Sequence, residues 1–136
     1  IPEKNIYMLE KIFSNFNHNS TDLICLPECV SIFSDSHSKL YDYAKHWHKV
    51  FIKFISENAK KLNSYILIGS YPEKKNNKFL NRSLLIDSNG KQVEHYDKIN
   101  LFNVKLDKNE TYKESRNFIS GRHLDIEPLI SPPPKP

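Results

Sequence analysis

Two short apolar runs of strand length most constrain the fold of this chain. The first, Asp22–Leu26, stops at Pro27, which is followed by the acid Glu28. The second, Tyr65–Ser70, is a continuous apolar run consistent with burial on both faces of a sheet. Loops that leave a packed sheet can hold polar groups without burying unpaired backbone. The sequence therefore predicts a layered α/β fold with Glu28 presented at the end of a buried strand.

Two amphipathic patterns predict helices around these strands. The first begins near Pro2, a residue that is tolerated in a first helical turn. Its apolar side chains recur at helical spacing: Ile6, Leu9, Ile12, Phe13 and Phe16. The second starts in the polar run Ser34–Ser38, which offers N-cap residues, and runs to about Asn63 with a broad apolar stripe. We expect His46 and His48 on it to be ordinary surface or boundary residues, because positions two apart face different sides of a helix.

A hairpin is predicted in the second half of the chain. The turn Asp87–Gly90 contains Asn-Gly, and both of these residues accept the positive φ of a tight turn. Strands are expected before it, over Phe79–Ile86, and after it, over Lys91–Lys98. We expect Pro72–Lys78 to be a charged loop. The polar stretch 103–120 reads as a long loop with a helical turn around 113–118.

Composition narrows the class of partner. A hydrophobic fraction of 38% and an aromatic fraction of 12% supply the apolar area that a folded domain needs. The net charge of +4 raises the question of nucleic acid, but only three of the 20 basic residues are arginines, and acids are interleaved with the lysines. No apolar run has the length of a membrane span, and the first residues lack a signal-peptide pattern. We expect neither a nucleic-acid nor a membrane partner, and a cytoplasmic location.

The two cysteines, Cys25 and Cys29, are spaced as C-x3-C. No second ligand pair accompanies them, so we expect a reduced pair of small buried residues, with Cys25 as inert packing inside the first strand. The sequence implies neither a metal nor an organic cofactor.

Four short motifs occur in a distinctive order, and Ile68-Gly69-Ser70 lies between the first and the second of them. They are Leu26-Pro27-Glu28-Cys29, the hairpin segment Asn81–Gly90, the run Tyr96–Phe102 and the segment Tyr112–Ser115. This combination resembles the nitrilase, or carbon–nitrogen hydrolase, superfamily, and within it the Nit-type amidases related to ω-amidase. The resemblance extends from the first helix to about Gly121. It implies part of an α-β-β-α sandwich, a mixed sheet with two helices on one face, and a small-molecule amide as substrate.

The resemblance also implies roles for three residues. Glu28 matches the family's general base, and Lys98 matches the lysine that stabilises an oxyanion. Glu114 resembles a second glutamate that supports the site and holds the lysine and substrate in place. In such chemistry a thiolate attacks the amide carbonyl, a carboxylate moves protons, and a cation offsets developing negative charge.

The departure from the family concerns the nucleophile. Relatives carry a cysteine a few tens of residues beyond the lysine, whereas the corresponding region here, Leu129–Pro136, contains none. Cys29 does not match that position. The strand before the first helix and the second half of the sandwich are also lacking. We therefore expect residues 1–123 to be an N-terminal portion of a carbon–nitrogen hydrolase domain, truncated at both ends, and 124–136 to be a proline-rich tail outside it.

Two functions stay open from the sequence. The first is an enzyme-derived, inactive fragment, either a piece of a longer product or the remnant of a degraded gene, and the proline-rich end favours the latter. The second is a non-catalytic α/β protein that binds or assembles by pairing exposed sheet edges. Uncovered strand edges and apolar surface also predict self-association.

Overall fold

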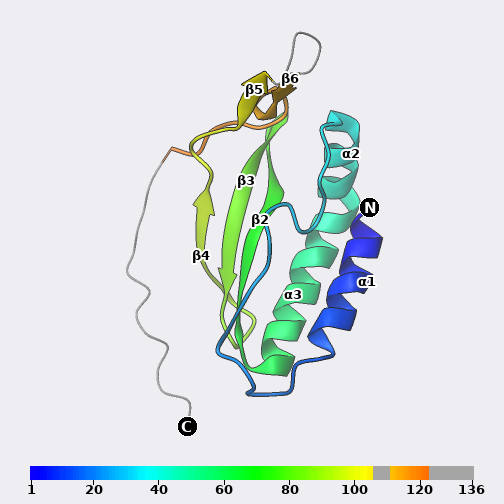
Figure 1. Cartoon of the computed structure of the whole chain (residues 1–136), viewed down its shortest axis with the longest axis vertical. Coiled ribbons are helices and arrows are strands. Elements are labelled where there is room, and N and C mark those ends of the chain that lie inside the picture. The colour runs from blue at the N-terminus through cyan, green and yellow to red at the C-terminus, as the bar shows by residue number, and fades with distance from the viewer. Residues whose placement is uncertain (106–110, 123–136) are drawn as a thin grey trace.

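The centre of the fold is a mixed four-stranded sheet (Figure 1). In the computed structural model, which describes residues 1–105 and 111–122, its order is β1-β2-β3-β4. The strands are β1 (Leu23–Cys25), β2 (Tyr65–Lys75), β3 (Lys78–Ile86) and β4 (Gln92–Asp97). β1 runs parallel to β2, and the other neighbours are antiparallel. The prediction of an α/β fold with a mixed sheet is confirmed.

Two helical runs cover one side of this sheet (Figure 1). The first is α1 (Pro2–Phe13). The second is continuous and consists of α2 (His37–Asp42), the π-helical segment η1 (Tyr43–Trp47) and α3 (His48–Leu62). Ser36 caps its start by accepting a hydrogen bond from the Lys39 amide, and Asn63, at φ 51°, ends it in the left-handed conformation. Both ends agree with the helix predicted from the sequence.

The apolar core has two parts. The larger lies between the helices and the sheet, and its fully buried members are Phe51, Ile55, Ala59, Ile66, Ile68 and Ile86. The smaller, which we call the Phe79 cluster, consists of Ile32, Leu40, Tyr43, Phe79 and Phe118. The Phe79 amide donates to the Asn117 carbonyl at 3.0 Å, and the Ile119 amide donates to the Phe79 carbonyl at 2.8 Å. These two hydrogen bonds, together with the packing of Phe118 in the Phe79 cluster, hold the segment around residues 114–121 against β3.

The stretch Pro72–Lys78 was predicted to be a loop, and that prediction is wrong. β2 continues to Lys75, and β3 begins at Lys78 after a tight turn in which Asn76 has a φ of 56°. Pro72 is tolerated in β2 because β1 pairs only with residues 65–67, so within the described part of the chain no strand on that side needs its missing N–H. The predicted turn at Asp87–Gly90 is present, with Gly90 at φ 75° and its amide 2.8 Å from the Asp87 carbonyl.

The polar stretch after β4 is also more ordered than a loop. β5 (Asn103–Lys105) pairs with β6 (Thr111–Lys113), and a 3-10 turn, η2 (Glu114–Arg116), follows within the range predicted for a helical turn. Backbone pairing of this kind leaves no apolar periodicity in the sequence, which is why the strands were missed. The predicted tail, 124–136, lies outside the described residues.

The edges of the sheet are exposed. In β1 only Ile24 is buried, whereas Leu23 is 46% exposed and Cys25 is exposed as well. The expectation of a fully buried first strand with Cys25 as inert packing is therefore wrong, because in the described part of the chain the helices cover only one side of the sheet. At the opposite edge, Val93 and Tyr96 of β4 are exposed. Among the described residues, no helix combines the length and apolar character needed to cross a bilayer.

Candidate active site

Glu28 is placed by the segment that leaves β1. The Leu26 amide still pairs with the Leu67 carbonyl at 2.8 Å, and the chain then crosses directly over Gly69. A Cβ on Gly69 would lie 2.3 Å from the Leu26 carbonyl oxygen and 2.6 Å from the Pro27 carbonyl carbon. Only a glycine allows this approach. The apolar run was expected to end at Ser70, but β2 continues to Lys75, and the role of Gly69 is to let the Glu28 segment pass.

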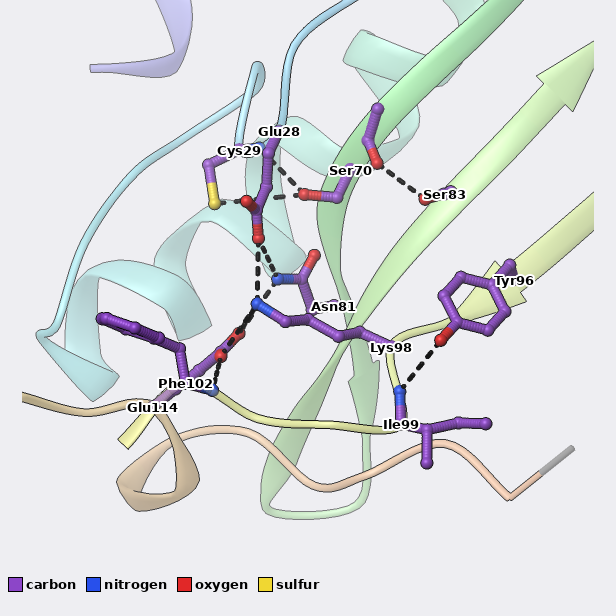
Figure 2. A network of polar contacts seen from close by, with 11 residues as sticks. Glu28, Cys29, Ser70, Asn81, Ser83, Tyr96, Lys98, Ile99, Phe102 and Glu114 are labelled. Atoms are coloured by element: carbon purple, nitrogen blue, oxygen red, sulfur yellow. Dashed lines mark hydrogen bonds and ion pairs between the residues drawn. The ribbon is translucent and has the colours of Figure 1, made fainter. Parts of the chain in front are cut away.

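Ser70 fixes the next residues of that segment. Its hydroxyl accepts a hydrogen bond from the Cys29 amide at 2.9 Å, and its carbonyl accepts one from the Val30 amide at 3.2 Å. Cys29 itself has a positive φ of 55°. These contacts hold the turn in which the Glu28 side chain points toward the end of β4 (Figure 2).

Lys98 follows the last residue of β4. Its amide donates to the Asn81 carbonyl at 2.9 Å, and its carbonyl accepts from the Gly121 amide at 2.9 Å. The preceding Asp97 binds Arg82 of β3 through two hydrogen bonds of 2.7 and 2.9 Å. The backbone at Lys98 is therefore held on both sides, which limits where its side chain can reach.

Glu114 begins η2 and is 6% exposed. One carboxylate oxygen accepts the Phe102 amide at 2.6 Å, and the Glu114 amide donates back to the Phe102 carbonyl at 3.1 Å. A buried carboxylate is costly unless its oxygens are hydrogen-bonded. The contacts with Phe102, together with those of the cluster below, meet this requirement.

The three predicted site residues, Glu28, Lys98 and Glu114, meet together with Asn81 in one cluster, which we call the Lys98 cluster (Figure 2). Lys98 Nζ lies 3.2 Å from Glu28 Oε1 and 3.1 Å from Glu114 Oε2. Asn81 Nδ2 donates to Oε1 of both glutamates at 2.9 Å. Glu28 and Lys98 are 70 positions apart, so only the tertiary fold brings them together. Their catalytic roles stay predictions.

The charges of this cluster stabilise one another. The hydrogen bond from Asn81 lowers the pKa of Glu28, burial opposes it, and Lys98 lowers it further. Burial lowers the pKa of Lys98, but hydrogen bonds and charges from Glu114 and Glu28 outweigh this and raise it above the ordinary lysine value. At neutral pH the cluster therefore holds an ionised Glu28 and a Lys98 ammonium, the states that a proton acceptor and an oxyanion donor require.

The thiol of Cys29 is a poor nucleophile in this environment. Burial raises the pKa of its thiol, and the negative charges of Glu28 and Glu114 raise it further. A thiol attacks as the thiolate, so a raised pKa makes it a poorer nucleophile at neutral pH. Both cysteines are free, as predicted, and neither is placed as an activated nucleophile.

A cavity of about 830 Å³ opens beside the Lys98 cluster. It is lined by the three predicted site residues, by Asn81 and by several aromatic side chains, among them Phe33, Tyr71, Phe102, Tyr112 and Phe118. A volume of this size accommodates a small molecule. In residues 1–105 and 111–122, no group of three histidine, cysteine, aspartate or glutamate side chains comes together in a way that could hold a metal ion.

The sequence analysis gave no role to Asn81, nor to a second polar network that consists of His48, Glu73 and Tyr71. In that network His48 Nε2 lies 3.3 Å from Glu73 Oε2, and the His48 ring stacks on Tyr71 at 5.4 Å. His48 was expected to be an ordinary surface or boundary residue, and it is half-buried between helix and sheet. The one available signal for Asn81 was a polar residue inside the apolar run that forms β3.

Comparison with known proteins identifies the family. The carbon–nitrogen hydrolase family model matches residues 2–133. Nitrilase homolog 2 of Dictyostelium discoideum is 30% identical over 127 residues, which are 91% of this chain and 38% of that protein. The deaminated glutathione amidase of Yersinia enterocolitica is 27% identical over 126 residues, which are 90% of this chain and 44% of that protein. The chain thus spans less than half the length of these relatives.

A solved structure shares this fold. The crystal structure of the C. elegans NitFhit protein superimposes with a TM-score of 0.79 at 22% identity and covers 89% of this chain and 30% of that one. The match to the family model confirms the resemblance inferred from the four sequence motifs, and this chain belongs to the carbon–nitrogen hydrolase family.

Proposed function

We propose that residues 1–122 form the proton-transfer half of an amide-hydrolase site. Glu28 acts as general base, Lys98 stabilises the oxyanion, and Glu114 holds Lys98 in place. The observation that carries this proposal is the position of Lys98 Nζ, within 3.2 Å of one carboxylate and 3.1 Å of another at the edge of a cavity of about 830 Å³. The ammonium contacts three carboxylate oxygens, Oε1 of Glu28 and both oxygens of Glu114, and it lines the cavity together with them.

The arrangement suits thiol-dependent cleavage of an amide. Glu28 would take the thiol proton as sulfur attacks the carbonyl carbon, and the Lys98 ammonium would stabilise the oxygen as it becomes negative. Glu28 would then return the proton to the nitrogen as the carbon–nitrogen bond breaks, releasing ammonia. It would next take a proton from the water that frees the acyl group. These steps require a thiol that faces the cavity and is easily ionised.

Neither cysteine of this sequence meets that requirement. Cys25 lies on the exposed edge strand, and Cys29 has a raised thiol pKa. We therefore propose that these 136 residues alone do not hydrolyse amides and that the nucleophile has to come from other residues. A small amide is the substrate class, in keeping with the activity for which the Yersinia relative is named.

A chimera tests this proposal. Residues 1–122 are joined to the part of the Yersinia deaminated glutathione amidase that follows its matched region, and ammonia release from short ω-amides is measured beside the intact relative. We expect the chimera to release ammonia and the 136-residue chain alone to release none. A folded chimera without activity contradicts the proposal. So does release by the 136-residue chain that survives both Glu28→Gln and thiol blockage.

A second function, assembly through sheet edges, is favoured by the exposure of Leu23 at one edge and of Val93 and Tyr96 at the other. Unpaired edges with apolar side chains promote pairing with another chain.

We expect self-association of the 136-residue chain at micromolar concentration in sedimentation velocity. The variant Val93→Lys should shift it toward monomer, because an edge lysine opposes strand pairing. Val50→Lys, at a similarly exposed valine of α3, is the matched control. A monomer with a sharp cooperative melt contradicts this function.

A further inference from the structure

The Lys98 cluster contains a closed ring of contacts. Asn81 Nδ2 donates to Glu28 Oε1 and to Glu114 Oε1, at 2.9 Å each. Lys98 Nζ closes the ring, at 3.2 Å from Glu28 Oε1 and 3.4 Å from Glu114 Oε1 (Figure 2). Two carboxylates thus share one ammonium and one neutral amide. The amide lies between the two acids and is 4% exposed.

The orientation of this amide follows from its neighbours. An ionised carboxylate only accepts hydrogen bonds, and the NH₂ group of asparagine carries two donors. Turning the amide around would place Oδ1 against two carboxylates, where it would make no hydrogen bond and would meet negative charge. Both N–H groups are therefore committed to the acids, one to each.

The backbone of Asn81 also positions Lys98, the cation of the cluster. The Asn81 carbonyl accepts the Lys98 amide at 2.9 Å, and Asn81 is paired opposite Pro72 in the middle of the β2–β3 hairpin. Asn81 thus positions Glu28 and Glu114 through its side chain and Lys98 through its main chain. A substitution of the Asn81 side chain removes the contacts to the two glutamates and leaves the main-chain hydrogen bond to Lys98.

A neutral donor is the residue type that this position requires. A carboxylate here would add a third negative charge, and an ammonium would compete with Lys98 for the acids and for a developing oxyanion. An amide supplies two hydrogen bonds and no charge, so Lys98 stays the single cation of the cluster.

We infer that Asn81 is a positioning residue that keeps Glu28 ionised and directed at the cavity by bridging it to the buried Glu114. This inference rests on the proposed function for the identity of the site. The lowered pKa of Glu28, for which the Asn81 hydrogen bond is the largest cause, agrees with it.

The test is an NMR titration of the full 136-residue chain labelled at glutamate side-chain carboxyl carbons. Asn81→Leu removes both donors at nearly constant size. We expect the midpoint of the Glu28 titration to move upward by about one pH unit, a tenfold change in proton affinity, because a hydrogen bond to a charged group is lost. The matched control is Asn117→Leu, since Asn117 is also buried but its Nδ2 donates to the Asp35 carbonyl and not to a carboxylate. A Glu28 midpoint that moves no further in Asn81→Leu than in Asn117→Leu overturns the inference.

Two further measurements apply if Asn81→Leu does not fold. In the unsubstituted chain, the side-chain NH₂ signals of Asn81 should shift with the Glu28 titration, while those of Asn117 should not. Asn81→Asp, which keeps the shape of the side chain, should make the cluster bind an additional proton above the ordinary glutamate range, because three carboxylates cannot all stay ionised around one lysine. An Asn81 signal that is independent of Glu28, or three carboxyl groups that titrate in their ordinary range, overturns the inference.

These outcomes are separate from those of the proposed function. The titrations report the bridge whether or not Glu28 transfers protons in a reaction. If the midpoint moves as expected but the folded chimera is inactive, the bridge stands and the catalytic proposal fails. If the midpoint does not move but the chimera depends on Glu28, the catalytic proposal stands and the role of Asn81 fails.

Discussion

Phe79→Ala is expected to lower the free energy of unfolding by about 3–5 kcal/mol, the usual cost of truncating a buried phenylalanine. Phe79 is fully buried, with its ring 6.1 Å from Phe118 and 5.7 Å from His37, measured between centroids. Removing the ring leaves a cavity at the centre of the Phe79 cluster. The loss is a large fraction of the total stability of a small domain, about 5–15 kcal/mol. Chemical denaturation followed by circular dichroism at low protein concentration measures it.

The same substitution should loosen the site. Phe79 packs against the segment that carries Glu114, so the contact between Glu114 and Lys98 should weaken with it. Phe33→Ala is the matched control, because Phe33 is 76% exposed and should cost less than about 0.5 kcal/mol. Equal losses in the two variants would show that the Phe79 cluster does not support this end of the sheet.

Glu28→Gln is expected to lower kcat/KM of the chimera by about 10²–10⁴-fold, the range in which general acid–base groups contribute. Glutamine has nearly the same shape and still accepts the Asn81 hydrogen bond, but it cannot take a proton from a thiol. Lys98 keeps Glu114 as an ion-pair partner at 3.1 Å, so the rest of the cluster should stay assembled. The effect should therefore fall on the chemical step and not on folding.

The sequence predicted those helices and hairpins whose ends carry a capping residue or a turn residue. Ser36 and Asn63 delimit the second helical run, and the turn Asp87–Gly90 closes the second hairpin. In each case one side chain or one backbone angle determines the boundary. Glu28 was also identifiable as a candidate, because it follows the end of an apolar strand, where loops can hold polar groups, and the family resemblance then gave it a role.

What the sequence could not show depends on long-range contacts. Asn81 acquires its role only when Glu28 and Glu114, 53 and 33 positions away, fold against it. The exposure of Cys25 depends on which side of the sheet the helices cover, and a three-residue strand carries no signal of that. The strand at Pro72 is possible because, among the described residues, β1 pairs with only the first three residues of β2, and no local sequence signal marks where that pairing stops.

The role of Glu28 as general base is tested by the ratio of kcat/KM between the Glu28→Gln chimera and the unsubstituted chimera. Glu57→Gln is the control, because Glu57 is exposed on α3 and only forms a loose ion pair with Lys53 at 3.7 Å. With all three proteins shown to be folded, we expect a loss of about 10²–10⁴-fold for Glu28→Gln and none for Glu57→Gln. Equal rates in the three would contradict the assignment of Glu28 as the base of this site.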